Sequence, residues 1–277
     1  MSLDTATGKV VVITGAGSGI GRALATRAAR GGALLALSDW DAEGLAETVR
    51  LAEHAGAAKV RHDVVDVSDR AAVREWAAGV VEEFGVVNLV VNNAGVTATG
   101  DFADLTYEDL DWIVGINFYG VVHGSKEFLP HLIASGDGAL VNISSLFGLV
   151  SVPGQSAYNA TKYAVRGLTE AIREEMLVAG HPVTVTCVHP GGIRTGISRN
   201  GRKAAGLDGA RIDALFDKKL AKMSPDRAAE IILTGALAGK PRVLVGLDAH
   251  LIHQFARIAG ARYQDVVARV TSRMPLR

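Results

Sequence analysis

A tyrosine and a lysine four residues apart, Tyr158 and Lys162, have the side chains needed for proton transfer. On a helix, positions four apart lie on one face, so the phenol and the ammonium would be neighbours. A positive charge beside a phenol favours the phenolate and lowers a phenol pKa that is otherwise about 10. A tyrosine tuned in this way could donate or accept a proton at a reacting oxygen, an effect worth roughly 10²–10⁴ in rate.

Two adjacent serines, Ser144 and Ser145, close an apolar run upstream of this pair. A serine hydroxyl can hydrogen-bond a carbonyl oxygen and orient it, and either serine could do so. Reduction of a carbonyl needs a hydride on carbon and a proton on oxygen, and hydride transfer is the chemistry of a nicotinamide cofactor. The three side-chain types therefore predict an oxidoreductase, provided that a cofactor site accompanies them.

A glycine-rich segment at residues 14–21, Thr-Gly-Ala-Gly-Ser-Gly-Ile-Gly, joins the first predicted strand to the first predicted helix. Glycines allow a tight turn there and let the backbone approach a pyrophosphate at the helix N-terminus, where free N–H groups and the helix dipole favour anions. The place between strand and helix distinguishes this loop from an ordinary glycine turn. Its predicted cofactor contacts are Gly15, Ser18, Gly19, Ile20 and Gly21.

The next candidate is Asp39, which lies 24 residues after Gly15 at the end of the second predicted strand. A carboxylate there can accept hydrogen bonds from the adenosine ribose, and it would repel the extra phosphate of NADP. Ser18 brings no positive charge to the loop, and the nearby Arg22 is expected to face solvent. The sequence therefore predicts NAD as cofactor, with NADP disfavoured.

Short apolar runs alternate with helical patterns along the chain, which predicts one parallel sheet covered by helices on both faces. We expect a single doubly wound α/β domain of about seven strands, a Rossmann fold, over residues 1–277. A long segment at 192–224 is expected to form a substrate lid, and 249–277 a C-terminal helical tail. Strands are predicted at 9–14, 34–38, 59–64, 87–91, 139–144, 183–189 and 242–245, and helices at 20–30, 42–54, 70–84, 107–132, 157–177 and 226–238.

In their order and spacing these motifs resemble the short-chain dehydrogenase/reductase family over about 195 residues. The resemblance implies a nicotinamide cofactor and catalysis by a serine, a tyrosine and a lysine. Ser145 precedes Tyr158 by the 13 residues common in the family, so it is preferred as the catalytic serine, with Ser144 as its support. In the family the lysine also holds the nicotinamide ribose, and an asparagine, here Asn117, positions a water that relays protons to it.

The resemblance also assigns further cofactor contacts. Asp66 and Val67 match the pair that contacts the adenine in the family, although Asp63 and Val64 compete for that assignment. A segment after the fourth predicted strand matches the motif that lines the cofactor, and a segment after the sixth matches the motif on the nicotinamide side. These two segments contribute Asn93, Ala94 and Gly95, and Pro190, Gly191, Ile193 and Thr195.

Two other functions use related sites. An epimerase or dehydratase of the extended type would share the Tyr158–Lys162 pair, but such proteins usually carry a larger C-terminal substrate domain. A catalytically silent NAD-sensing protein would often lack one of the three catalytic side chains, all of which are present here. We expect no metal site, because no histidine has partners at metal-ligand spacing, and no hydrolase nucleophile, because a Gly-x-Ser-x-Gly elbow is absent.

The bulk composition is neutral, with 29 basic and 29 acidic residues, which gives no reason to expect nucleic acid as a partner. The lone cysteine, Cys187, lies in an apolar run and is expected to be a buried, inert thiol. No apolar stretch reaches the roughly 20 residues of a membrane-spanning helix. The cytoplasm is therefore the expected location.

Charge is unevenly placed, because residues 194–224 hold eight lysines and arginines against three aspartates. Either this is a solvated lid surface, or it attracts an acidic or lipophilic alcohol or ketone, or an anionic membrane surface that supplies one. Members of the family usually assemble through the two long helices, here 107–132 and 157–177. The resemblance thus implies a homodimer or homotetramer.

Overall fold

The computed structural model describes residues 7–272, apart from the side chain of Lys219. A parallel seven-stranded sheet with the order β3-β2-β1-β4-β6-β7-β9 runs through these residues, which confirms the predicted doubly wound α/β fold. The strand order reverses between β1 and β4, where ligands bind in folds of this type. The strands are β1 (Val10–Thr14), β2 (Leu34–Asp39), β3 (Lys59–Val64), β4 (Leu89–Asn92), β6 (Gly138–Ile143), β7 (Val183–Pro190) and β9 (Arg242–Val245).

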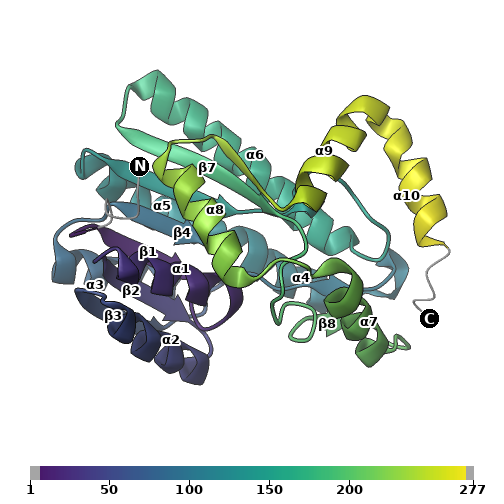
Figure 1. The fold of residues 1–277 in the computed structure, drawn as a ribbon, viewed down its shortest axis with the longest axis horizontal. Coiled ribbons are helices and arrows are strands. Elements are labelled where there is room, and N and C mark those ends of the chain that lie inside the picture. The colour runs from purple at the N-terminus through teal and green to yellow at the C-terminus, as the bar shows by residue number, and fades with distance from the viewer. Residues whose placement is uncertain (1–6, 273–277) are drawn as a thin grey trace.

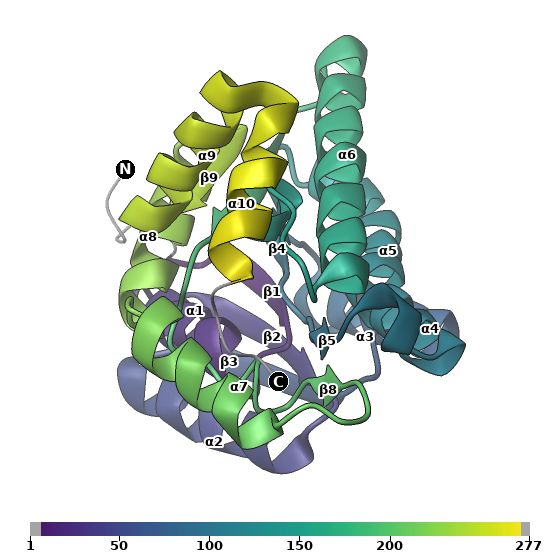
Figure 2. The same ribbon diagram turned by 90° about the vertical axis from the view of Figure 1, so that its right-hand side faces the viewer.

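Helices cover both faces of the sheet (Figures 1 and 2). Because side chains alternate along a strand, Val11 and Ile13 join one apolar cluster and Val12 joins the other. Burial of these two clusters fixes the sheet between its helical layers. The first cluster lies under α1 (Gly19–Arg30), α2 (Ala42–Ala55) and α8 (Pro225–Leu237), and the second under α3 (Arg70–Phe84), α5 (Gly120–Ala134) and α6 (Ser156–Ala179).

The helix predicted at 107–132 differs from the structure in its middle. It consists of α4 (Tyr107–Val114), a π-helical turn at Gly115–Tyr119, and α5. The predicted continuity was therefore wrong, because one turn is widened. Such turns in helices are frequently found at functional sites, and this one contains Asn117.

The lid, residues 192–224, has secondary structure that the sequence did not indicate. Its β8 (Arg202–Lys203) pairs in parallel with β5 (Ala98–Thr99), and it continues into α7 (Gly209–Leu215) and a π-helical turn at Phe216–Leu220. Figure 1 shows the lid at the end of the sheet toward which the strands point.

The tail forms two helices rather than one, α9 (Leu247–Ala259) and α10 (Tyr263–Thr271), joined by a turn at Gly260–Arg262. We call this pair the C-terminal hairpin; the remaining predicted tail residues, 273–277, lie outside the described residues. Within residues 7–272, no helix is long and apolar enough to span a membrane.

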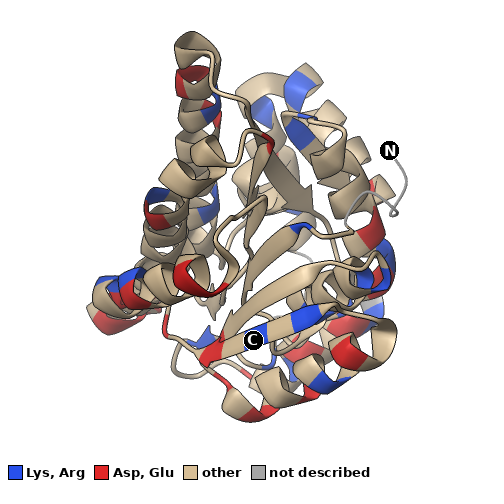
Figure 3. Ribbon diagram, turned by 90° about the vertical axis from the view of Figure 1, so that its left-hand side faces the viewer, with Lys and Arg blue, Asp and Glu red and all other residues tan. Residues whose placement is uncertain are grey.

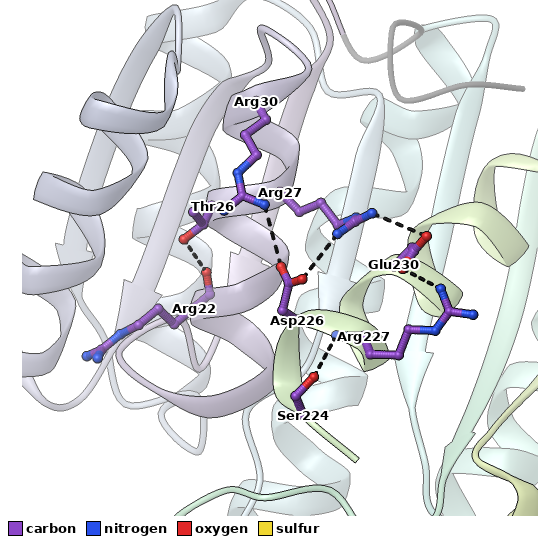
Figure 4. A network of polar contacts seen from close by, with 8 residues as sticks. All are labelled: Arg22, Thr26, Arg27, Arg30, Ser224, Asp226, Arg227 and Glu230. Atoms are coloured by element: carbon purple, nitrogen blue, oxygen red, sulfur yellow. Dashed lines mark hydrogen bonds and ion pairs between the residues drawn. The ribbon is translucent and has the colours of Figure 1, made fainter.

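Ion pairs connect the cofactor-side helix α1 to α8 (Figure 4). Arg27 contacts both Asp226 and Glu230 at 3.4 Å, and Arg30 approaches Asp226 at 3.6 Å. The side chain of Ser224 caps α8 by accepting from the backbone N–H of Arg227 at 3.3 Å. Because these pairs are partly exposed, each contributes little to stability, and packing holds the two helices together.

A buried polar network lies beneath the catalytic end of the sheet. Asn92, which is 1% exposed, donates to the Oδ1 of Asn142 at 2.8 Å, and Asn142 donates to the hydroxyl of Thr169 at 3.1 Å. Gly124 of α5 packs against this network, since a Cβ added there would lie 2.1 Å from Oδ1 of Asn92. The close approach of α5 to β4 therefore requires a glycine.

We expect Gly124→Ala to lower the free energy of unfolding by about 1–3 kcal/mol, because the added methyl forces the helix or the network to move. The matched control is Gly167→Ala in α6, where nothing lies within 4 Å of the added Cβ. That helical substitution should be neutral or stabilising by up to about 1 kcal/mol. Urea denaturation of the two variants measures both effects, and equal stabilities would contradict the packing argument.

Candidate active site

The glycine loop is held against β4 by Thr14 and Asn93. The hydroxyl of Thr14 accepts from the backbone N–H groups of Asn93 and Ala94 at 3.0 and 3.1 Å. The amide of Asn93 in turn donates to the carbonyls of Thr14 and Gly15, each at 3.0 Å. Asn93 thus positions the loop that the sequence assigns to the cofactor, and Thr14 is a second positioning residue that our predictions did not include.

The same loop fits a pyrophosphate group. A Cβ on Gly15 would lie 2.7 Å from the Cα of Ala94, and a Cβ on Gly21 would lie 2.0 Å from the carbonyl oxygen of Gly15, so only glycines allow this close turn. Ser18, the N-cap residue directly before α1, makes no side-chain capping hydrogen bond. The N–H groups of the first turn of α1 thus remain available for an anion.

Asp39 ends β2 beside this loop, and 9% of it is exposed. Its Oδ2 accepts from the N–H of Gly17 at 2.7 Å and its Oδ1 from the N–H of Asp41 at 2.9 Å. Both bonds fix the carboxylate while leaving lone pairs for ribose hydroxyls. Arg22 does not simply face solvent as predicted, because its guanidinium donates to the carbonyls of Gly17 and Gly44.

The structure separates the two pairs proposed for the adenine. Asp63 lies in an ion pair with Arg61 at 2.8 Å, and Val64 is 62% exposed at the end of β3. Asp66 and Val67 lie in the turn that follows, where Asp66 accepts from the N–H and hydroxyl of Ser68 at 2.9 and 2.7 Å. This placement favours Asp66 and Val67.

The predicted catalytic serine and tyrosine meet beyond the carboxyl end of β6. Ser145 begins the short helical turn Leu146–Gly148, and its hydroxyl accepts from the N–H of Phe147 at 3.1 Å. The Ser145 hydroxyl lies near the Tyr158 phenol and acts to lower its pKa. Ser144 instead points away and donates to the carbonyl oxygen of Lys162 at 2.8 Å, a supporting contact.

Lys162 lies one helical turn after Tyr158, and it is 3% exposed. Its ammonium donates to the carbonyl of Ile143 at 3.0 Å and lies 5.6 Å from the centre of the Tyr158 ring. Burial lowers the pKa of Lys162 to about 8. The amino group of Lys162 therefore changes its protonation state near pH 8.

Burial raises the pKa of Tyr158, and the nearby Ser145 hydroxyl only partly opposes that shift. This direction is opposite to the predicted effect of Lys162. Desolvation disfavours the phenolate, and Lys162 is not among the groups that shift this pKa. The phenol is consequently protonated at neutral pH, which suits a proton donor.

Asn117 is brought to the other side of Lys162 by the π-helical turn. Its amide group accepts from the N–H of Val96 at 2.8 Å, donates to the Val96 carbonyl at 2.9 Å, and lies 3.2 Å from the hydroxyl of Thr161. A Cβ on Gly95 would be 3.3 Å from both the Asn117 Oδ1 and the Lys162 Nζ. Gly95 thus leaves open the space between these two polar atoms.

The nicotinamide-side segment follows the end of β7. Thr195 lies over the glycine loop, with its methyl carbon 3.1 Å from the Cβ position of Gly19. Ile193 is 4% exposed and belongs to the apolar core, so its side chain is a packing group. Asp248 of α9, which the sequence analysis missed, accepts from the N–H of Gly192 at 2.7 Å and also lies against Gly191.

A buried histidine also contacts the backbone of the predicted catalytic serine. His189 of β7 is fully buried, and its Nδ1 lies 2.8 Å from the carbonyl oxygen of Ser145. Burial lowers its pKa to about 4, so the ring is neutral and donates this hydrogen bond. In the sequence, the only indication that His189 contacts the site is that it directly precedes Pro190.

Many charges of the lid are neutralised by ion pairs. Arg199 pairs with Asp217 at 2.6 Å and Lys203 with Asp213 at 3.2 Å. Arg202 reaches Asp109 at 3.2 Å and lies over the ring of Trp112 at 4.4 Å. These three cations therefore fasten the lid to itself and to α4, while the lid keeps its excess of positive over negative residues.

Comparison with known proteins agrees with this geometry. The model of the short chain dehydrogenase family matches residues 9–206. A Mycobacterium tuberculosis protein that carries the name oxidoreductase SadH is 56% identical over 94% of both chains. The 2-(R)-hydroxypropyl-CoM dehydrogenase of Xanthobacter autotrophicus is 34% identical and covers 93% of this chain and 99% of its own.

Solved structures agree as well. A short-chain dehydrogenase/reductase from Burkholderia phymatum in complex with NAD superimposes with a TM-score of 0.86 at 30% identity, covering 94% of this chain and 96% of its own. A short-chain dehydrogenase from Mycobacterium paratuberculosis bound to NAD has a TM-score of 0.75 at 28% identity, with 87% and 97% covered. The family model, the similar sequences and the similar structures all agree. The chain therefore belongs to the short-chain dehydrogenase/reductase family of oxidoreductases.

Proposed function

We propose that the protein moves a hydride between NAD(H) and a secondary alcohol or ketone. The observation that carries this proposal is the grouping of Ser145, Tyr158 and Lys162, in which the buried Lys162 ammonium lies 5.6 Å from the centre of the Tyr158 ring. These groups lie beyond the carboxyl ends of the strands, as does the glycine loop. Two similar proteins are named for such reactions, 2-(R)-hydroxypropyl-CoM dehydrogenase and levodione reductase.

In this proposal Ser145 holds the substrate oxygen, and Tyr158 gives it a proton during reduction or takes one during oxidation. Lys162 donates to the nicotinamide ribose and restores the proton of Tyr158. Asn117 would orient a water in the space beside Gly95, completing the relay to Lys162. A bound nicotinamide would supply the hydride, held at Pro190, Gly191 and Thr195.

NAD is the proposed cofactor because Asp39 stands where the adenosine ribose would bind. The two similar structures from Burkholderia phymatum and Mycobacterium paratuberculosis hold NAD. Arg22 is engaged with the carbonyls of Gly17 and Gly44, so it is poorly placed to accept a ribose phosphate.

A panel of secondary alcohols with NAD, and of ketones with NADH, tests the proposed reaction through NADH absorbance. We expect turnover of at least one alcohol and of its matching ketone. An NAD-sensing protein would bind NAD without any turnover. An epimerase or dehydratase would convert its substrate without a net change in NADH, so either result would overturn the proposal.

We further propose that the chain works as one catalytic domain, since all the candidate site residues lie on one sheet or on the helices and turns connected to it. The proposed location is the cytoplasm. The substrate class stays open between neutral and acidic, lipophilic compounds. Because the lid holds eight lysines and arginines against three aspartates, kcat/KM should fall with rising ionic strength for an acidic substrate and change little for a neutral one.

A homodimer or homotetramer through the helices α4, α5 and α6 is the proposed assembly. Exposed apolar side chains on these helices support it, among them Tyr107 at 86%, Tyr119 at 50% and Leu177 at 62%. Light scattering at micromolar concentration should give two or four times the chain mass of 29.0 kDa. A monomer would contradict this prediction.

A further inference from the structure

A cavity of about 280 Å³ lies between the C-terminal hairpin and the body of the protein. Arg166 of α6 and Arg242 of β9 line it from the body, and His253 and Arg257 of α9 line it from the hairpin. Leu149 and Tyr263 complete the wall on the side of the catalytic turn. The volume lies near the lower end of ligand pockets, roughly 300–1,000 Å³, and suits a small molecule or one group of a larger one.

The wall of this cavity carries more positive than negative charge. Among the described residues, Glu170 is the carboxylate that pairs with its arginines, and it pairs with both Arg166, at 3.0 Å, and Arg242. Arg257 forms no ion pair within residues 7–272. Figure 3 shows several basic positions close together in the upper part of the molecule with one acidic position below them, whereas basic and acidic positions are mixed along the helices in its lower part.

One buried polar group at the wall lacks a partner, and a histidine there is surrounded by cations. The Nε of Arg242 is buried and has no hydrogen-bond acceptor in the described part of the chain. Burial lowers the pKa of His253, and Arg242, Arg257, Arg166 and His250 lower it further. An environment that disfavours another cation stabilises an anion.

We propose that this cavity binds a phosphate group, held by Arg166, Arg242 and Arg257. Guanidinium groups bind phosphate through paired, charge-assisted hydrogen bonds, and three of them can serve its oxygens from three sides. The phosphate group could belong to free orthophosphate, to a soluble phosphate monoester or to a lipid.

The occupant would connect the hairpin to the turn that carries Ser145. The Tyr263 hydroxyl already accepts from the N–H of Ser151 at 2.9 Å, and Leu146 and Val150 pack against Ala249 and Tyr263. An anion bridging Arg257 of the hairpin to the two arginines of the body adds a third connection. Its binding should therefore slow amide hydrogen exchange in residues 146–151.

Calorimetric titration of the whole protein with orthophosphate at constant ionic strength tests the proposal. We expect saturable binding that weakens about tenfold or more in Arg257→Gln, because a charged donor is lost. The matched control is Arg262→Gln, which removes the same charge from the hairpin turn outside the cavity and should bind as the wild type does. In the wild type, phosphate should also raise the pKa of His253, followed by proton NMR.

The glycine loop could bind phosphate too, so each titration is repeated with saturating NAD. Phosphate bound in the cavity persists with NAD, whereas phosphate at the loop is displaced by it. Glycerol phosphate and short-chain phosphatidic acid are titrated in the same way to distinguish a soluble ester from a lipid.

The proposal is overturned if none of the three ligands binds, or if Arg257→Gln and Arg262→Gln bind alike. Displacement of all bound phosphate by NAD overturns it as well. None of these measurements needs turnover, so they can fail while the proposed dehydrogenase reaction stands, and the reverse also holds.

Discussion

Replacing Tyr158 by phenylalanine should lower kcat by about 10²–10⁴-fold for both alcohol oxidation and ketone reduction, because the variant lacks the hydroxyl that exchanges a proton with the substrate. The ring itself packs edge-on against Phe147 at 6.1 Å, and phenylalanine retains that contact. Stopped-flow absorbance gives the rate, and fluorescence titration with NAD should show nearly unchanged cofactor affinity. A kcat close to that of the wild type in this variant would contradict the proposed mechanism.

The pH dependence follows from the same pair. Burial raises the pKa of Tyr158 and lowers that of Lys162 to about 8. Alcohol oxidation needs a proton acceptor, so its kcat/KM should rise with pH as the pair of Tyr158 and Lys162 loses a proton. Ketone reduction needs a proton donor, so its kcat/KM should be higher at low pH than at high pH. The rising limb should be lost in Tyr158→Phe, and a flat profile in the wild type would place the proton acceptor elsewhere.

The second large effect concerns cofactor choice. We expect the wild type to prefer NAD over NADP by well over tenfold in kcat/KM, because a ribose phosphate would lie against the carboxylate of Asp39. In Asp39→Ala the preference should fall toward equality, chiefly through weaker use of NAD. Initial rates with both cofactors measure the ratio.

Asp41→Ala is the matched control. This neighbouring carboxylate caps α2 by accepting from the N–H of Gly44 at 3.2 Å. Its loss should cost about 1 kcal/mol of stability and leave the cofactor ratio unchanged. Equal use of NAD and NADP by the wild type would show that Arg22 or a lid arginine overrides Asp39.

Local sequence patterns predicted the elements that carry the site. The central strands β1, β4 and β6 are buried throughout, as is nearly all of β2. A polar residue follows the apolar run of β2, so this strand could be expected to end beside Asp39. The helical spacing of Tyr158 and Lys162 could be expected to place both on one face of α6. Ser145 was selected by its family spacing, and its place beside the Tyr158 phenol agrees with that selection.

Other features depend on contacts between residues distant in the sequence. The direction of the Tyr158 pKa shift reflects burial that four-residue spacing does not reveal. The widened turn at Asn117 depends on its bonds to Val96 and Thr161, and the hairpin depends on packing of Tyr263 beneath the catalytic turn. Neither Asp248 nor His189 belongs to a recognisable motif, because each acts on a backbone group of another segment.

The C-terminal hairpin lies beyond residue 206, where the family match ends, yet two of its side chains contact the backbone on opposite sides of the site. Asp248 accepts from Gly192 on the nicotinamide side, and Tyr263 accepts from Ser151 beside the catalytic turn. For protein engineering, this makes the hairpin an exchangeable module with two defined attachment points. A hairpin transplanted from a relative should support catalysis only if it brings an acceptor to each of these two amides.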